Sequence, residues 1–359
     1  MLSSCSTAAD YAALFQSASK IIAVETAYGV SNGGVHDAAQ IFHARLRDAS
    51  SLISTLELIS KYFDDNVCLE ACQDKGLQIR VVDQAKCSFV DAFFPATAAH
   101  GQAPVFSRFD CGRSYFPMWI APALLGRAIR TATDSRKRAI IGQSFVLHLT
   151  VASSDPDHLI LEGEMTAGTG PRVAGVVKST RQDLALLTPT FDASTCFVDG
   201  NSFTFTGEAL FESPDLLVEI LSDVKSSGCE EVTLTLSSLC LQLSGKASDN
   251  CSRLQVSLRG CTGTGALYLH APETTISTHF KARHLQRLSH LCGNSTRVLL
   301  QVGEEAPLSA AFELRGGGTC QIFIAPCLKD ELKCDEDEEQ QQGQLYGDAG
   351  NTLDASVQL

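Results

Sequence analysis

The middle of the chain contains many short runs in which apolar and polar residues alternate. The clearest are SFVLHLTV at 144–151, HLILEGEM at 158–165, EVTLTLSS at 231–238, LCLQLSG at 239–245, RVLLQV at 297–302, LSAAFEL at 308–314 and CQIFIAP at 320–326. A period of two places the apolar residues on one face of a strand. We therefore predict strands with one face on a core and the other in water, as in antiparallel sheets.

Other segments repeat their apolar residues with the period of a helix. The predicted stripes are Leu52, Leu56, Ile59 and Phe63 within 50–64, Leu217, Leu221 and Val224 within 214–225, and Leu285, Leu288 and Cys292 in a last helix. Each stripe predicts a helix that packs on a sheet. Ser213 and Pro214 supply an N-cap and a first-turn proline for the second helix. In the last helix, Arg283, Arg287 and His290 follow the opposite face.

The predicted elements recur twice. A unit of strand, helix and two strands occupies 41–83 and again 202–245, and a unit of helix leading into strand occupies 121–151 and again 277–302. Such a repeat indicates an α+β protein of two similar domains, each with two helices packed on antiparallel sheets. We expect domains at 41–172 and 195–330, joined by a connector over 173–194.

The two ends of the chain differ from this core in composition. Residues 1–40 are rich in Ala, Ser and Gly, with one possible short helix near Tyr11–Ile22, and are expected to form a flexible extension. Residues 331–359 are acidic and Gln-rich, which predicts disorder. No apolar run reaches the roughly 20 residues that span a bilayer. The N-terminus is typical neither of a secretory signal nor of a mitochondrial presequence.

Charge and motifs narrow the function. A net charge of −13 argues against generic coating of nucleic acid, although it permits a local basic patch. The fourteen cysteines include no C-x-x-C pair, so we expect buried or idle thiols in a reducing compartment rather than a metal site. The triple glycine at 316–318 lacks the Lys-Ser/Thr of a phosphate loop, and there is no G-x-S-x-G elbow. We expect neither an enzyme nor a bound cofactor.

Several stretches in register with the repeat resemble one family. Residues 41–83 are similar to the opening strand, helix and hairpin of the eukaryotic sliding clamp, proliferating cell nuclear antigen. The stretch SRFDCGRSYFPMWIAPALLGRAI resembles its second strand block and helix, and PLSAAFELRGGGTCQIFIAPCLKDE resembles its last hairpin, Ala-Pro end and acidic tail. The match covers roughly 41–335. It implies a nuclear homotrimeric ring with helices lining the hole, which encircles duplex DNA without reading its sequence. It also implies a processivity factor that binds DNA polymerases, the clamp loader and other replication and repair proteins.

The resemblance implies a set of cations facing DNA. Arg127 and Arg130 lie three residues apart on one helix, away from Leu125 and Ile129. The candidates are Arg127, Arg130, Arg136, Lys137, Lys281, Arg283 and Arg287, with Arg45 and Lys61 in the first unit. The alternative is that these charges only solvate a helix face. The helix at 214–225 carries Glu219 and Ser222 where the family usually has arginines, which lowers the expected strength of DNA contact.

The resemblance also implies a hydrophobic groove for a short helical turn of partner proteins. Its residues would be Val82, Lys86, Cys87, Phe89, Leu187, Pro189, Pro307, Phe323, Ala325 and Pro326. Ala325 and Pro326 would end the last strand as one wall, because proline removes a strand donor. The alternative for Val82 and Phe89 is an ordinary core or edge position.

By the same resemblance, the ring would close between the strands at 157–165 and 230–238, in a head-to-tail contact. Two other functions remain open. The chain could be a subunit of a checkpoint-type heterotrimeric clamp or a divergent paralogue, or it could be an interaction scaffold without DNA binding.

Overall fold

The structure is a computed structural model that describes residues 40–46, 48–97, 104–137, 144–166, 176–188, 203–247, 253–260, 266–272, 274–304 and 306–327. The predicted N-terminal extension, the acidic tail and most of the predicted connector lie outside these residues. Within them, no helix combines the length and apolar character needed to cross a bilayer.

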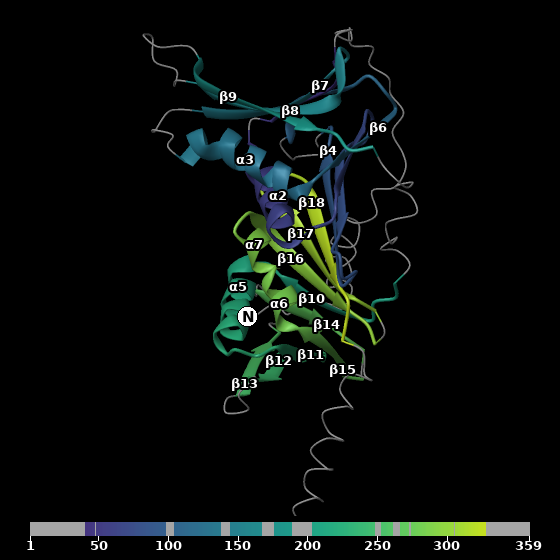
Figure 1. Ribbon diagram of the computed structural model, residues 1–359. Coiled ribbons are helices and arrows are strands. Elements are labelled where there is room, and N and C mark those ends of the chain that lie inside the picture. Colours follow the sequence, from purple (N-terminus) through teal and green to yellow (C-terminus); the bar gives the residue numbers. More distant parts are fainter. Residues whose placement is uncertain are drawn as a thin grey trace, which may run out of the picture.

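One order of elements occurs twice along the chain (Figure 1). The first copy runs β1 (Gln40–Leu46), α2 (Ser50–Tyr62), β2 (Val67–Cys72), β3 (Gly76–Val82), β4 (Ser88–Pro95), β5 (Phe106–Cys111), β6 (Tyr115–Ile120), α3 (Pro122–Lys137), β7 (Ser144–Ala152), β8 (Asp155–Thr166) and β9 (Val176–Ala185). The second runs β10 (Gly207–Phe211), α5 (Pro214–Ser226), β11 (Glu231–Leu236), β12 (Cys240–Lys246), β13 (Arg253–Arg259), β14 (Leu267–His270), β15 (Ile276–Lys281), α6 (Ala282–Gln286), α7 (Ser289–Cys292), β16 (Ser295–Val302), β17 (Leu308–Leu314) and β18 (Thr319–Ile324). The predicted α+β class with two similar copies is confirmed.

The described strands pair into three antiparallel sheets. Their orders are β5-β1-β7-β8-β9, β14-β10-β16-β17-β18-β4-β3-β2-β6 and β13-β12-β11-β15. The long sheet crosses from one copy to the other where β18 pairs with β4. The sheets wrap around a layer formed by α2, α3, α5, α6 and α7, which lies on one side of the molecule (Figure 1).

The helices pack on the sheets through the stripes that the sequence predicts. Leu52, Leu56, Ile59 and Phe63 are at most 2% exposed, and Leu217, Leu221 and Val224 are buried as well. Pro214 begins α5 after Ser213, whose side chain makes no capping hydrogen bond. Burial of these stripes supplies most of the helices' stability, since short helices are marginal alone.

The last predicted helix is divided into α6 and α7. Its backbone N–H groups at Arg287, Leu288, His290 and Leu291 donate to carbonyls three residues earlier. This tighter winding turns each residue by about 120° instead of about 100°. Side chains four residues apart therefore no longer share a face.

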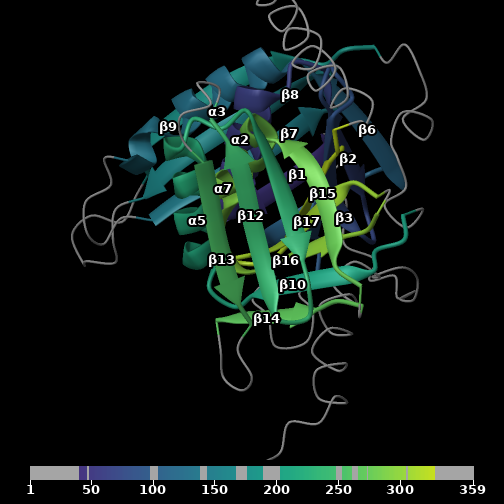
Figure 2. The same cartoon turned by 90° about the horizontal axis from the view of Figure 1, so that it is seen from below.

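Two predictions about strand placement are wrong. Residues 176–185, expected within the connector, form β9 and pair with β8. The predicted ring-closing strands are interior: β8 lies between β7 and β9, and β11 lies between β12 and β15. The first sheet ends instead in β9, the neighbour of β8. The four-stranded sheet ends in β13, which β12 separates from β11, and Figure 2 shows β13 as the outer strand of that sheet.

Candidate functional site

The exposed side of the helix layer carries three arginines with no ion pair among the described residues. Arg127 and Arg130 are exposed on α3, opposite the buried Leu125 and Ile129. Arg283 is exposed on α6, where its Nε donates to Nε2 of His284 at 3.4 Å. The helices that carry these cations, α3 and α6, belong to one layer on the same side of the sheets (Figure 1).

Helix α5 gives the same layer a negative region. Asp215, Glu219, Ser222 and Asp223 are exposed along it, and Lys225 is the exposed cation in its last turn. A phosphate backbone that passes over α5 would meet mainly carboxylates. Attraction for a polyanion is therefore concentrated on α3 and α6.

Three predicted DNA-facing cations differ from these exposed arginines in direction or in having an ion-pair partner. Arg45 points away from the helices, because alternate residues of β1 (Phe42, Ala44 and Leu46) fill the core. The side chain of Arg287 is 12% exposed and pairs with Asp83, since the tight α6–α7 winding turns it away from the Arg283 face. Lys281 pairs with Glu231, which lies opposite it across β11 and β15.

The other predicted cations remain candidates. Lys61 is exposed near the end of α2, with its Nζ 3.3 Å from Nε2 of His290 and 5.0 Å from the centre of the Tyr62 ring. Arg136 and Lys137 lie in the last turn of α3, and their side chains fall outside the described residues.

Aromatic residues gather where β4 and β18 meet, on the face opposite the helices. Val82, Phe89 and Phe323 lie in one cross-strand row over β3, β4 and β18. The Phe89 and Phe323 rings stack with centroids 5.7 Å apart. Phe203 lies 6.0 Å from Phe323 and 6.3 Å from Phe205. Phe203 and Phe205 were not predicted as groove residues, although the alternation in SFTFTG places both rings on one side of the segment just before β10.

The chain after β18 borders this row. The Ala325 amide donates to the Cys87 carbonyl at 2.8 Å, and the Cys327 amide donates to the His279 carbonyl at 2.8 Å. Pro326 and Pro307 are half-buried nearby, and Lys86 is exposed. The structure thus brings together predicted groove residues from the β3–β4 loop and the C-terminal segment.

Leu187 does not join this group. Its amide donates to the Trp119 carbonyl of β6 at 2.8 Å, and β2 and β3 separate β6 from β4. The prediction that Leu187 lines the groove beside Phe323 is therefore wrong, because β9 occupies residues assigned to the connector and the connector starts later. Pro189 lies outside the described residues.

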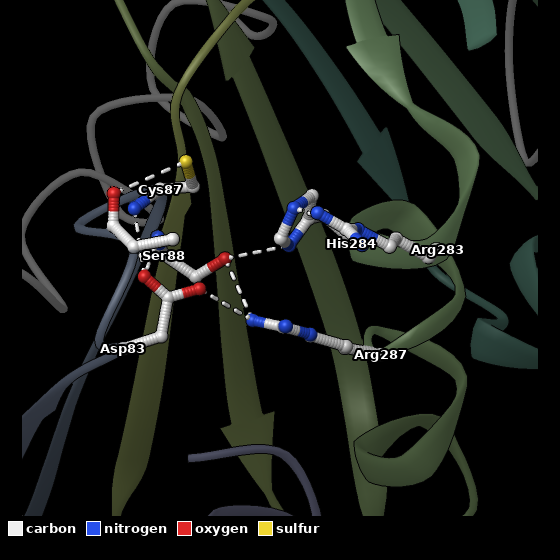
Figure 3. A network of polar contacts seen from close by, with 7 residues as sticks. Asp83, Cys87, Ser88, Arg283, His284 and Arg287 are labelled. Carbon is white, nitrogen blue, oxygen red and sulfur yellow. Dashed lines mark hydrogen bonds and ion pairs between the residues drawn. The ribbon is translucent and has the colours of Figure 1, made fainter. Parts of the chain in front are cut away.

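A buried polar cluster lies between α6 and the β3–β4 loop (residues 83–88), which we call the groove loop (Figure 3). Asp83, Ser88 and His284 are at most 5% exposed, and Arg287 reaches them from the α6–α7 junction. Burial, followed by the nearby Arg287 charge, lowers the pKa of His284 to about 4. This imidazole is consequently neutral near pH 7.

Comparison with known proteins identifies the fold. No protein-family model and no curated protein matches the chain. Among solved structures, it is similar to the crystal structure of proliferating cellular nuclear antigen from Entamoeba histolytica, with a TM-score of 0.62 and 16% identity. The match covers 80% of this chain and 100% of that chain. The protein therefore has the α+β clamp fold.

Proposed function

We propose that the protein is a non-catalytic DNA sliding clamp of the nucleus. Three copies form a ring around duplex DNA and hold DNA polymerases and other replication and repair proteins to it. One observation carries the proposal: the long sheet consists of five strands of the second copy joined to four of the first through β18 and β4. The other five-stranded and four-stranded sheets end in β9 and β13, the counterparts of β18 and β4.

A ring follows if β9 of one subunit pairs with β13 of the next as β18 pairs with β4. Such a head-to-tail contact satisfies both exposed edges. The paired registers, aligned on the last buried residues of β1 and β10 (Leu46 and Phe211), equate Gln182 with Ile322. The registers of the other sheets, aligned on Ile120 and Phe280 two residues before α3 and α6, equate Leu254 with Val90. Asp183 of one subunit then faces Arg253 of the next. Opposite charges at this position favour association between identical chains.

The inner surface of that ring would be the helix layer. Arg127, Arg130 and Arg283 supply mobile phosphate contacts without base readout. The acidic exposed side of α5 limits how tightly DNA is held. A weak, sequence-independent contact suits a protein that must move along its duplex.

The groove at Phe89 and Phe323 would take a short helical turn with apolar anchors from each partner protein. Its support is the exposed loop 84–87 on one side and the Ala325–Pro326 segment on the other. Between them, Val82 is half-buried and Phe89 and Phe323 are 6% and 5% exposed, so the stacked rings would form the floor of the groove.

The test of DNA contact is charge reversal on the inner face. The combined variant Arg127→Glu, Arg130→Glu and Arg283→Glu should weaken binding to a fluorescein-labelled 40-base-pair duplex by at least about tenfold at low salt. It should also reduce the salt slope by about 0.9 for each phosphate that the protein no longer neutralises. Fluorescence anisotropy over a salt series measures both quantities.

A matched control reverses the exposed cations Lys75, Arg108 and Arg113, which lie outside the helix layer. It changes the net charge equally and should lose less affinity. Equal losses for the two variants would show that only total charge matters. That result would remove the inner face from the proposal and favour a scaffold without a DNA channel.

A further inference from the structure

Four nearly buried polar side chains connect the groove loop with the segment that carries Arg283. Asp83 and Ser88 come from the first copy, at the two ends of the β3–β4 loop, and His284 and Arg287 come from the second copy. Figure 3 shows His284 and Arg287 reaching from α6 toward Asp83 and Ser88. Buried polar groups of this kind are stable only when their hydrogen bonds are satisfied, so their arrangement is specific.

Asp83 fixes the loop and Arg287 at once. Its Oδ1 accepts from the Cys87 amide at 2.7 Å and from the Ser88 amide at 3.0 Å. Its Oδ2 lies 3.0 Å from Nη1 of Arg287. The loop needs such support, because Lys86 adopts a φ of 56°, a left-handed value that is uncommon for residues other than glycine.

Ser88 contacts both Arg287 and His284. Its Oγ accepts from Nη1 of Arg287 at 2.9 Å and lies 3.2 Å from Nδ1 of His284. On the other side of the imidazole, Nε2 of His284 accepts from Nε of Arg283 at 3.4 Å. A neutral imidazole that accepts at Nε2 carries its proton on Nδ1, so Nδ1 donates to Ser88.

Arg287 also connects this cluster to the end of α2. Its guanidinium carbon lies 5.3 Å from the Phe63 ring centre and 5.7 Å from the Tyr62 ring centre. Cation–π contact at this distance adds to the ion pair with Asp83. One side chain therefore joins the end of α2, the groove loop and the α6–α7 junction.

We propose that Asp83, Ser88, His284 and Arg287 form a relay of positioning residues that couples the groove to the inner face. On the groove side, the Cys87 carbonyl accepts from the Ala325 amide, so the loop and the groove wall move together. On the inner side, His284 orients the Arg283 guanidinium. The coupling rests on the proposed function, since it links the peptide groove and the DNA-facing arginine. Occupancy of either site then alters the affinity of the other by the same factor.

The first test removes the central hydroxyl with Ser88→Ala in the full chain. Ser309→Ala is the matched control, because it deletes a fully buried serine hydroxyl of the same sheet outside the relay. We expect Ser88→Ala to speed amide exchange at Cys87 and Ala325 by about fivefold, the factor for one lost hydrogen bond. We also expect faster modification of Arg283 by phenylglyoxal, measured by peptide mass spectrometry relative to Arg127. Ser309→Ala should change neither rate.

The second variant, His284→Phe, keeps a ring in the cavity and removes both hydrogen bonds, so it decides the matter if Ser88→Ala does not fold. It should raise the phenylglyoxal rate of Arg283 and also the exchange rate at Cys87. Unchanged loop exchange in His284→Phe would overturn the relay, and so would an unchanged Arg283 rate in Ser88→Ala.

A third measurement separates the relay from the proposed function. With the labelled 40-base-pair duplex, Ser88→Ala should lower affinity by about threefold, although Ser88 contacts no exposed inner surface. If the wild-type protein does not bind the duplex, the proposed function fails. The phenylglyoxal and exchange rates still decide the relay in that case.

Discussion

The junction between β4 and β18 and the open edges of β9 and β13 are the same structural position used in two ways. In the closed junction, Ile322 faces Val90 and both are buried. At the equivalent open edges, Gln182 and Leu254 are half-buried. The residues on the opposite face also become more polar at the open edges. The closed junction has the stacked Phe89 and Phe323 where the open edges have Arg253 and Asp183.

In the proposed ring, the same pairing geometry would be permanent within the chain and reversible between subunits. The closed junction is apolar on its core face, and on the other face Phe89 stacks on Phe323 beside the polar pair Asp91 and Gln321, so it forms as part of folding. The open edges carry polar and charged side chains, which oppose unspecific pairing of exposed strands. Assembly would then depend on protein concentration, whereas the junction inside the chain does not.

The largest expected effect comes from the same substitution at two equivalent positions. Ile322→Asp buries an unpaired carboxylate in the closed junction and should cost roughly 4 kcal/mol or more of unfolding free energy. Gln182→Asp at the open edge should leave the free energy of unfolding of a single subunit nearly unchanged. Urea denaturation of both variants measures the difference.

The variant Gln182→Leu is a control for this comparison of the two positions. It gives the open edge of β9 an apolar core-facing residue like Ile322 in the closed junction. This variant should fold normally and associate more strongly. If Gln182→Asp destabilised a single subunit as much as Ile322→Asp does, the two positions would not differ in burial as described.

An intermediate effect concerns pH, because a buried histidine lies at one end of the closed junction. The pKa of His284 is lowered to about 4, so the unfolded chain binds a proton more readily than the folded one. Stability is therefore full above the ordinary histidine pKa near 6.5 and is lost as pH falls from there toward about 4. We expect a loss of about 2 kcal/mol between pH 7 and 4.5 from this group, a loss that His284→Phe would not show.

Thermal unfolding of wild type and His284→Phe across this pH range measures the effect. His43 on β1 also has a lowered pKa, through burial and the Arg108 charge. The variant His43→Phe therefore serves as the comparison. Parallel pH profiles for wild type and His284→Phe would exclude the assigned role of His284.

The smallest expected effect is an exchange of charge at the open edges. Asp183→Arg or Arg253→Asp alone should weaken association by about 1 kcal/mol at each contact, because like charges then face each other. The double variant should regain most of the loss. Sedimentation of the three variants over a concentration series measures association, and failure of the double variant to recover would show that the register is different.

The repeated order of strands and helices could be predicted from the sequence because it rests on local periodicity. Leu52, Leu56 and Ile59 mark α2, and alternation marks strands such as β17 and β18. The strand β9 was missed because its core-facing row consists of Lys178, Thr180, Gln182 and Leu184, with one large apolar residue.

The candidate site was predicted less well, because its details depend on contacts distant in sequence. Arg287 meets Asp83 across 204 positions, and no local pattern reveals that pairing. The tight winding after Ala282 also has no strong local signal, so the spacing of Arg283 and Arg287 suggested a shared face. Arg127 and Arg130 were placed correctly on the exposed face, since α3 is a regular helix with a clear apolar side.

The mass of the assembled particle tests the central claim, that β9 of one subunit pairs with β13 of the next, most directly. Native mass spectrometry of the full chain at micromolar concentration should give a species of three times the 38.4 kDa of one chain. That species should diminish in favour of single chains on dilution and in the Asp183→Arg variant. A wild-type protein that remains a single chain at these concentrations would contradict the account.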